Sequence, residues 1–491
     1  MNIVPAPDRA RKSRIARTRV EIFGRSHMVF SNPKFLFGDI IDEVVWGPYL
    51  LVLLLGTGIY LSVRLGFFQI TGIKLWWSGT FGHMFSKQNR RKEKGNNISP
   101  FRAVMTSMAA TVGTGNIVGV ATAIYSGGPG AVFWMWISGF FGMMTKYSEI
   151  ILAVKYRGKD KDGTHRGGPM YYMEKGLNMK WLAVIYAVLG VLATLGTGNL
   201  TQSNAISQAV NAAFGVPVVI IGITLAVLCA LVILGGIKRI ASFSAVVVPF
   251  MVCFYIVGSL IALISNAAKL PEAFSLIIRE AFSLRAAGGG IAGYVIMKAM
   301  RFGFARGVFS NEAGLGTASM AHSVSYEKEP VRQGFWGLFE VFLDTIVINT
   351  LSALIFIVFG LYGGSIQPSG MTLAMTAFIH AFGSGFGPVF MSFIILCFAG
   401  STIISWSYYG QQCLGYLTRN NKTVSMVYKI AFCGLIIVGS LGGMTFFWEL
   451  ADIFNGLMAI PNLIALLLLS RVITSVSKEY LAARKHKKLK E

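Results

Sequence analysis

Two glycine-rich segments carry the polar groups best suited to bind a ligand. The first is Thr111-Val-Gly-Thr-Gly-Asn-Ile-Val-Gly119, and the second is Phe309-Ser-Asn-Glu-Ala-Gly-Leu-Gly-Thr317. Glycine allows backbone to unwind, and it costs about 1 kcal/mol inside a helix. Unwound segments present N–H groups to a carboxylate and carbonyl groups to a cation. They predict a site for a zwitterion and a cation, with close packing through the glycines as the alternative.

A third segment, Gly196-Thr-Gly-Asn-Leu-Thr-Gln202, repeats the Gly-Thr-Gly-Asn of the first. Asn199 and Gln202 are three residues apart and share one helix face, where either side chain can hydrogen-bond a substrate carboxylate or amine. Bonding between helices is the equal alternative. Thr402 and Ser405 offer hydroxyls at helical spacing to a hard cation, although such hydroxyls also bond to their own helix.

Several large or charged side chains in apolar stretches need a partner or a role. Trp406 is either a wall of the substrate cavity or a core residue. Glu312, at the second glycine segment, is expected to cap backbone or brace a gate. Glu340 and Asp344 lie one helical turn apart in an apolar stretch. Burying an acidic side chain inside a membrane costs free energy. A structural ion pair is the leading interpretation, and a proton or cation relay is the alternative. The expected partners of the two acids are Lys298, Arg301 and Arg306.

The composition indicates a membrane protein. Of the 491 residues, 54% are hydrophobic and 13% are charged, whereas soluble domains carry about 25% charged residues. The net charge of +23 comes from basic residues in loops and tails, which argues against a nucleic-acid-binding face. The five cysteines lie in or at the end of apolar stretches without Cys-x-x-Cys spacing, so we expect small core residues and no bound metal or other cofactor.

Eleven apolar stretches are long enough to cross a bilayer as helices, and spanning strands are excluded because the stretches do not alternate. A segment over 67–85 is aromatic and predicts an interfacial helix or a packed loop. The expected spans are 47–66, 101–124, 131–155, 181–205, 217–235, 243–266, 289–322, 336–360, 385–412, 426–444 and 446–470.

Loop charge orients these spans. One set of loops, which includes the tail 471–491, holds 25 Lys and Arg, and the opposite set holds three. The positive-inside rule places the first set and the C-terminus in the cytoplasm, and eleven spans then place the N-terminus outside. Residues 1–27 carry seven Lys and Arg that would have to cross the membrane. Translation from Met28 would remove this conflict.

The two glycine segments lie in the second and seventh spans. These spans are five helices apart, so the second set of five enters the membrane from the opposite side. The pattern predicts an inverted repeat whose first helix is broken in each half, which points to a transporter site. The expected divisions are a basic tail and lead-in at 1–46, a first helix and interfacial segment at 47–100, five-helix repeats at 101–288 and 289–470, and a basic tail at 471–491.

Other classes of membrane protein fit poorly. A channel predicts rings of repeated charged or carbonyl motifs, and a membrane enzyme predicts a nucleophile, metal pair or cofactor motif. The sequence contains none of these. A receptor or scaffold predicts a large soluble domain, but the longest loop is about 35 residues.

The chain resembles the alanine or glycine:cation symporter family from Asp39 to Arg471. The resemblance rests on Gly127-Gly-Pro-Gly-Ala-Val-Phe-Trp-Met-Trp-Ile-Ser-Gly-Phe-Phe-Gly142 and on the two glycine segments. It implies the inverted-repeat fold of the leucine-transporter-like group, in the cell membrane. It also implies import of alanine or glycine with co-transported Na+ or H+. A relative that carries glutamine or another larger neutral amino acid is the alternative.

The resemblance also implies site residues. Val112-Gly-Thr-Gly-Asn116 looks like a sodium motif of this fold, and Ala399-Gly-Ser-Thr402 is similar to the span that completes the sodium site. The matching span often has Ser or Thr where this chain has Ile403, which leaves that site one ligand short. The implied cation ligands are Ala109, Val112, Asn116, Ala399 and Thr402. The expected substrate-binding residues are Thr114, Gly115, Asn116, Asn199, Gln202, Phe309, Gly314 and Trp406.

Overall fold

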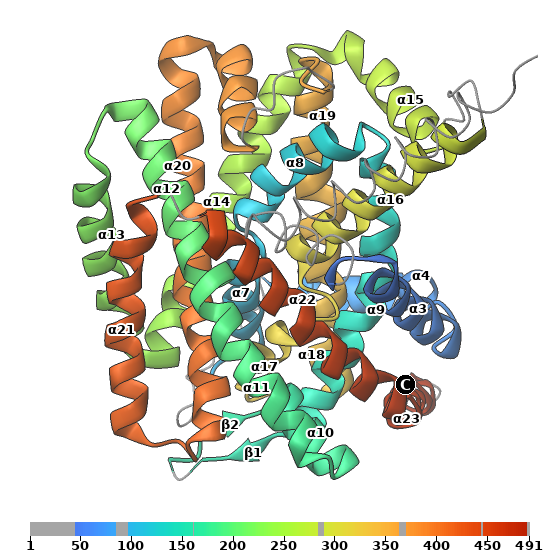
Figure 1. The fold of residues 1–491 in the computed structure, drawn as a ribbon. Helices are drawn as coiled ribbons and strands as arrows, with labels where there is room; N and C mark the ends of the chain where they lie inside the picture. The colour runs from blue at the N-terminus through green and yellow to red at the C-terminus, as the bar shows by residue number, and fades with distance from the viewer. Residues whose placement is uncertain are drawn as a thin grey trace, which may run out of the picture.

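The computed structural model describes residues 45–84, 97–160, 162–282, 289–362, 370–442 and 445–488. The basic N-terminal tail, the lead-in up to residue 44 and the possible start at Met28 lie outside these ranges. Helix dominates, and among the described residues one hairpin of two-residue strands is present, with β1 (Gly158–Lys159) antiparallel to β2 (His165–Arg166). β1, β2 and α10 lie at one end of the bundle and α15 at the other (Figure 1).

Helices occupy all of the ranges expected to span, as far as these are described. The first half of the chain contains α3 (Pro48–Arg64), α4 (Phe68–Thr71), α5 (Ile73–Gly79), α6 (Phe81–Met84), α7 (Pro100–Thr111), η3 (Thr114–Asn116), α8 (Val118–Gly127), α9 (Ala131–Tyr156), α10 (Pro169–Leu177), α11 (Lys180–Leu195), η4 (Gly196–Leu200), α12 (Thr201–Phe214), α13 (Val218–Ile233), α14 (Gly236–Ile264), η5 (Ala267–Lys269) and α15 (Leu270–Ala281).

The second half begins with the other broken span and ends in a helix where the sequence indicated a basic tail. It contains α16 (Gly289–Asn311), α17 (Thr317–Ser323), α18 (Pro330–Val341), η6 (Phe342–Ile348), α19 (Asn349–Val358), α20 (Gly370–Leu417), α21 (Lys422–Ser440), α22 (Thr445–Leu468) and α23 (Ser470–Lys488).

Both predicted helix breaks are present. α7 and the segment that begins at Thr114 meet at an angle of 59°, and α16 and α17 are separated by residues 312–316. Two further irregularities, the π-helical segments η4 and η6, were not predicted. π-Helical turns often occur at functional sites, and η4 coincides with the Gly-Thr-Gly-Asn repeat that the sequence analysis singled out.

Several expected loops are partly helical. α12 runs on to Phe214, and α15 fills much of the loop expected after residue 266. The prediction of a loop over 361–384 was wrong for residues 370–384, which are part of α20. There, α20 starts at Gly370 and turns at Gly383, whose φ of 81° requires the left-handed region. These helical stretches are too short or too polar to be recognised as membrane spans, so the sequence analysis placed them in loops.

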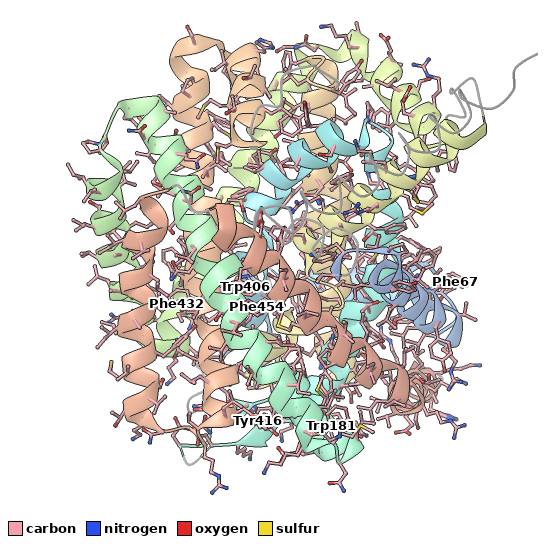
Figure 2. All side chains as sticks on the ribbon, viewed as in Figure 1. Phe67, Trp181, Trp406, Tyr416, Phe432 and Phe454 are labelled. Carbon is pink, nitrogen blue, oxygen red and sulfur yellow. The ribbon has the colours of Figure 1, made fainter. Side chains whose placement is uncertain are left out.

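Length and apolar composition identify six helices among the described residues that can cross a membrane, or seven if the bent pair of α7 and η3–α8 is one span. The count of eleven therefore stays a prediction. Exposed apolar side chains on α13, such as Ile220, Val227 and Leu231, form a surface suited to lipid. Trp181 and Tyr416 are labelled near the end of the bundle that holds β1 and β2 (Figure 2), as expected for an aromatic belt.

The cysteines are only partly the core residues that the sequence indicated. All five are free thiols. Cys229 and Cys413 are buried, Cys397 and Cys433 are partly exposed, and Cys253 is exposed on α14. The exposed thiol lies on a helix long and apolar enough to span, so the expectation of burial was wrong where a helix turns one face outward.

Candidate functional site

The first helix break brings unwound backbone against α20. Val112 and Gly113 separate α7 from η3 and have non-helical backbone angles. A Cβ atom at Gly113 would lie 2.5 Å from Thr402 Oγ1. Only glycine therefore permits this approach, which brings a hydroxyl of α20 to the break.

Oxygen atoms gather where α7 meets α20. Thr402 Oγ1 donates to Phe398 O at 2.9 Å and lies 3.4 Å from Ala110 O. Ser401 Oγ donates to Phe398 O at 2.9 Å and to Ala109 O at 3.3 Å. Hydroxyl and carbonyl oxygens suit a hard cation. The structure thus brings two of the expected ligands, Ala109 and Thr402, to one contact, and it adds Ser401, which the sequence analysis did not single out.

The remaining expected cation ligands divide between this contact and another. Val112 and Ala399 are fully buried beside it. Asn116 faces elsewhere: its Oδ1 accepts from Gly113 N at 2.9 Å, and its Nδ2 lies 2.6 Å from Asp344 Oδ1 and 2.8 Å from Asn349 Oδ1. Its side chain therefore joins the first break to η6 and α19.

Asp344 is the centre of this second cluster. The side chain is fully buried, and its Oδ2 accepts from Ser310 Oγ at 2.8 Å and Thr345 Oγ1 at 2.9 Å. Within the described ranges, no ion pair includes Asp344. A buried carboxylate without an opposite charge is costly, so this cluster is suited to hold a cation or a proton. The ion pair expected for Asp344 with Lys298, Arg301 or Arg306 was therefore wrong for the described residues.

The second break is held open by a carboxylate from α9. Glu312 has a φ of 56°, which strains a residue other than glycine, and Gly314 and Gly316 also have positive φ. Glu149 Oε1 accepts from Gly314 N at 2.9 Å and Gly316 N at 3.1 Å. Asn462 Nδ2 donates to Gly314 O at 2.8 Å. Both backbone groups of Gly314 are thus occupied by protein, and its substrate-binding role stays a prediction.

Trp406 links this break to α20. Its Nε1 donates to Glu312 Oε1 at 2.8 Å, and Thr317 Oγ1 donates to the other carboxylate oxygen at 2.5 Å. A Cβ atom at Gly198 would overlap Trp406 Cβ, so the indole packs directly on η4. Trp406 lies in the middle of the bundle (Figure 2) and is 2% exposed. Glu312 thus joins Trp406 of α20 to Thr317 of α17, and its expected role as a backbone cap or gate brace stays a prediction.

The expected partners of Glu340 were wrong. Its carboxylate lies 3.2 Å from Lys146 Nζ and 3.3 Å from His322 Nε2, and all three side chains are fully buried. Ser107 Oγ donates to it at 2.7 Å, and Lys146 Nζ also donates to Asn311 O at 2.6 Å. The sequence pointed to α16 because its basic residues are numerous, but Lys146 on α9 is the cation that packs against α18.

The basic residues of α16 have other surroundings. Lys298 is exposed, and Arg301 lies over the ring of Phe302 at 5.6 Å. Arg306 forms an ion pair with Asp452 at 3.8 Å and also lies over the Phe309 ring at 5.5 Å. These three residues therefore meet solvent, aromatic rings or an acid of α22.

A cavity of about 300 Å³ adjoins the first break, at Thr114. Such a volume suits a small ligand. Two expected substrate residues, Thr114 and Phe309, line it together with the ion pair of Arg306 and Asp452. The other lining residues are Val118, Gly119, Thr122, Asn204, Ala205, Gln208, Gly370 and Met371.

The two polar residues of the third glycine segment differ in their bonding. Asn199 Nδ2 donates to Phe432 O of α21 at 2.7 Å, which matches the helix–helix alternative. Gln202 Nε2 donates to Thr197 O at 3.1 Å, whereas its buried Oε1 has no hydrogen-bond partner among the described residues. That oxygen would lie 3.6 Å from a Cβ atom at Gly113. Gln202 therefore presents an unused acceptor beside the first break.

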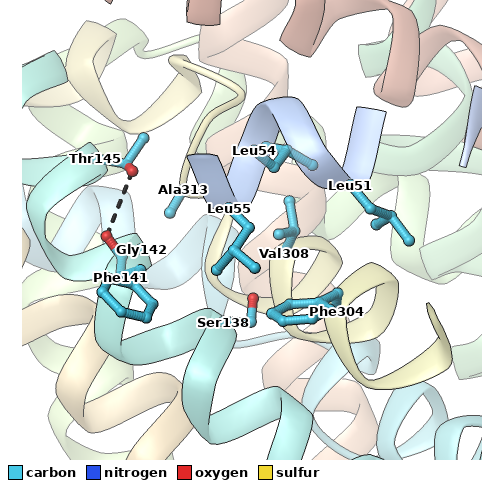
Figure 3. Close-up of a pocket in the computed structure, with 10 residues that line it drawn as sticks. All are labelled: Leu51, Leu54, Leu55, Ser138, Phe141, Gly142, Thr145, Phe304, Val308 and Ala313. Atoms are coloured by element: carbon cyan, nitrogen blue, oxygen red, sulfur yellow. Dashed lines mark hydrogen bonds between the residues drawn. The ribbon is translucent and has the colours of Figure 1, made fainter. Parts of the chain in front are cut away.

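Another cavity, of about 20 Å³, lies between α3, α9 and α16 (Figure 3). Leu51, Leu54 and Val308 are among its lining residues, and Thr145 Oγ1 already donates to Phe141 O. Its small volume and mostly apolar lining do not suit an amino acid.

The ends of both broken spans are joined on the side of the hairpin. Ile98, before α7, forms a parallel β-bridge with Ser325, after α17. The Arg157 guanidinium donates to the carbonyl oxygens of Ser323, Ser325 and Glu327 at 3.2, 2.8 and 2.5 Å. Burial lowers the pKa of Arg157 to about 10, which still leaves it charged at neutral pH. We call Arg157 and its three carbonyl partners the clasp.

Comparison with known proteins gives matches along nearly the whole chain. A model of the family described as the sodium:alanine symporter family matches residues 35–491. The sodium/alanine symporter AgcS of Methanococcus maripaludis is 44% identical over 452 residues, which are 91% of this chain and 97% of that protein. The probable sodium/glutamine symporter GlnT of Bacillus subtilis is 39% identical, over 91% of this chain and 90% of the relative.

Among solved structures, MhsT in complex with L-phenylalanine matches with a TM-score of 0.57. The identity is 14%, and the match covers 77% of this chain and 90% of that one. A likeness at this identity shows the fold alone, which is that of the leucine-transporter-like group.

Proposed function

This chain belongs to the sodium:alanine symporter family, and on that premise we propose that it imports alanine or glycine together with Na+ by alternating access. Membership of the family makes it a multi-pass membrane protein of cation-coupled amino-acid transport. The particular amino acids, the choice of Na+ over H+ and the residues that bind them are our proposal.

The observation that supports this proposal best is the meeting of the two breaks. A Cβ atom at Gly115 would lie 3.3 Å from both the Phe309 ring and the Ser310 Cα. In our proposal the substrate carboxylate binds the N–H groups at Thr114 and Gly115. Its ammonium group donates to the unused Oε1 of Gln202, and its side chain lies against Phe309 and Trp406.

The proposed cation position is the contact of α7 with α20. There the carbonyl oxygens of Ala109 and Ala110 face the hydroxyls of Ser401 and Thr402. Ile403 supplies no oxygen from its side chain, and Ser401 compensates for that departure from the family pattern. The Asp344 cluster is a second oxygen-rich position, and its carboxylate suits either Na+ or H+.

We further propose the arrangement in the cell membrane. One leading helix precedes two five-helix repeats of opposite orientation, with the first helix of each repeat broken at the site. The hairpin and the clasp then face the cytoplasm, and the cavity with Arg306 and Asp452 faces outward. The C-terminus lies inside and the N-terminus outside.

A larger neutral amino acid, such as glutamine, is the second candidate substrate. A relative of the same family is described as a probable sodium/glutamine symporter, and the cavity of about 300 Å³ exceeds the needs of alanine. The two substrates use the same backbone contacts and differ only at the side-chain end of the site.

Uptake into proteoliposomes tests the proposal. Purified protein is reconstituted, and radiolabelled alanine, glycine and glutamine are supplied with an imposed Na+ gradient, an imposed H+ gradient or none. We expect accumulation of alanine and glycine with the Na+ gradient. Accumulation with H+ alone would replace the ion, and preferential glutamine uptake would replace the substrate. No uptake of any neutral amino acid would contradict the proposed function.

A further inference from the structure

Asn455, in α22, is a buried amide that nothing in the fold accounts for. The residue is 1% exposed, and neither its Nδ2 nor its Oδ1 has a hydrogen-bond partner among the described residues. A buried donor and acceptor without partners destabilise a fold. Leucine has nearly the same shape without that cost, so the amide at this position points to a ligand that supplies both partners.

The neighbours on the same face of α22 locate Asn455. One turn earlier, Ala451 packs on η4, and its carbonyl accepts from Thr197 Oγ1 at 3.3 Å. Two turns later, Asn462 bonds to Gly314 in the second break at 2.8 Å. Residues 451, 455 and 462 fall within about 40° of each other around a helix of 3.6 residues per turn. Asn455 therefore faces the seam between η4 and the second break.

The same seam holds proposed substrate-binding groups. Trp406 packs on Gly198 of η4 and bonds to Glu312 of the second break at 2.8 Å. Asp452, three residues before Asn455, lines the cavity of about 300 Å³ together with Thr114 and Phe309. Asn455 thus belongs to α22, the helix that contributes Asp452 to the cavity lining, whereas the groups proposed for the substrate backbone come from η3 and α12.

We propose that Asn455 is a specificity-determining residue, which hydrogen-bonds the side chain of the transported amino acid and favours carboxamide and hydroxyl side chains over apolar ones of equal size. The inference rests on the proposed function and deepens it. A carboxamide carries the donor and the acceptor that complement an asparagine amide. With alanine bound, a water molecule takes that place.

The test compares asparagine and leucine, which have nearly the same shape, as competitors of labelled alanine uptake. In the wild type we expect asparagine to compete at a concentration at least about tenfold lower than leucine, because a site built for hydrogen bonds rejects an analogue that lacks them. In Asn455→Leu we expect that ratio to fall to about one or to invert. Asn211→Leu is the matched control, because among the described residues the Asn211 side chain bonds within its own loop, to Val216 O, and the ratio should stay unchanged.

A wild type without preference for asparagine, or an unchanged ratio in Asn455→Leu, would overturn the inference and leave Asn455 a structural residue with bound water. If Asn455→Leu does not fold, Asn455→Ser must show the same loss of preference. Thermal unfolding separates this inference from the proposed function. Should no gradient drive uptake, stabilisation of the wild type by asparagine that is absent in the variant still supports it, and absence of stabilisation in both refutes it.

Discussion

At the scale of single residues, two buried carboxylates differ in whether a positively charged side chain lies beside them. Glu340 faces Lys146 at 3.2 Å inside the bundle, whereas Asp344, four residues later, has only amide and hydroxyl partners. A buried carboxylate beside a cationic side chain is already neutralised, whereas one without such a neighbour needs a bound proton or cation to be neutralised. We therefore propose that a change at Asp344 can identify the coupling ion.

Replacement of Asp344 by asparagine tests this assignment. Asp344→Asn keeps the shape of the side chain and removes its charge, so we expect the stimulation of uptake by the coupling ion to fall by roughly tenfold or more. The measurement is the initial rate of alanine uptake in proteoliposomes over a series of Na+ concentrations and pH values. Asp160→Asn, in the hairpin beside Arg166, is the control. Wild-type ion dependence in Asp344→Asn would exclude Asp344 from coupling.

A single methyl group tests the contact of the first break with α20. In Gly113→Ala the new Cβ would lie 2.5 Å from Thr402 Oγ1, so the Thr402 side chain or α20 must shift. We expect ion-dependent uptake to fall by about tenfold or more, since a small displacement of ligands is costly. Gly400→Ala is the matched control, because a Cβ there meets nothing within 4 Å. Equal activity of both variants would contradict the proposed cation position.

At the scale of elements, the clasp ties together loops that follow α9 and α17. We expect Arg157→Lys to lower the free energy of unfolding by about 2 kcal/mol, because an ammonium group replaces at most part of three hydrogen bonds from a guanidinium. Thermal unfolding of purified protein in detergent measures this change. Arg166→Lys, at a partly exposed ion pair, should cost less. Equal effects of the two changes would show that the clasp does not hold these loops.

At the scale of the whole molecule, the testable property is orientation. The distribution of basic residues predicts that the loop before α21 is cytoplasmic and the loop after α14 is external. Thr423→Cys and Ala267→Cys place exposed thiols there in a chain whose native cysteines have been replaced. A membrane-impermeant maleimide should label Ala267→Cys in intact cells and Thr423→Cys only after permeabilisation. The reverse pattern would invert the proposed topology.

The sequence predicts those features of the molecule that depend on composition within one stretch. The helix breaks at Thr111–Gly119 and Phe309–Thr317 were found because glycine and polar residues interrupt apolar helices. The likeness to a transporter of known structure supports the fold in general. The π-helical turns of η4 and η6 were not found, because one additional residue in a helical turn leaves no clear signal in hydrophobic periodicity.

Contacts between distant elements were beyond sequence reasoning. Lys146 looks like one basic residue in an apolar helix, and nothing local connects it with Glu340, which lies nearly two hundred residues away. Ser401 and Asn455 are missed for the same reason, because a single polar residue in a span carries no information about what it faces. Thr402 and Gln202 were found because their segments repeat or resemble known motifs.

The bridge between Ile98 and Ser325 bears on leakage. These residues adjoin the half-helices α7 and α17, and two backbone hydrogen bonds join them, from Ile98 N to Val324 O at 3.2 Å and from Tyr326 N to Ile98 O at 2.9 Å, so a movement of one half-helix would pull on the other. A slipped cycle, in which the ion crosses without cargo, would need such a partial movement. In the proposed transport cycle the bridge would make the two displacements one event, so ions would cross only together with an amino acid.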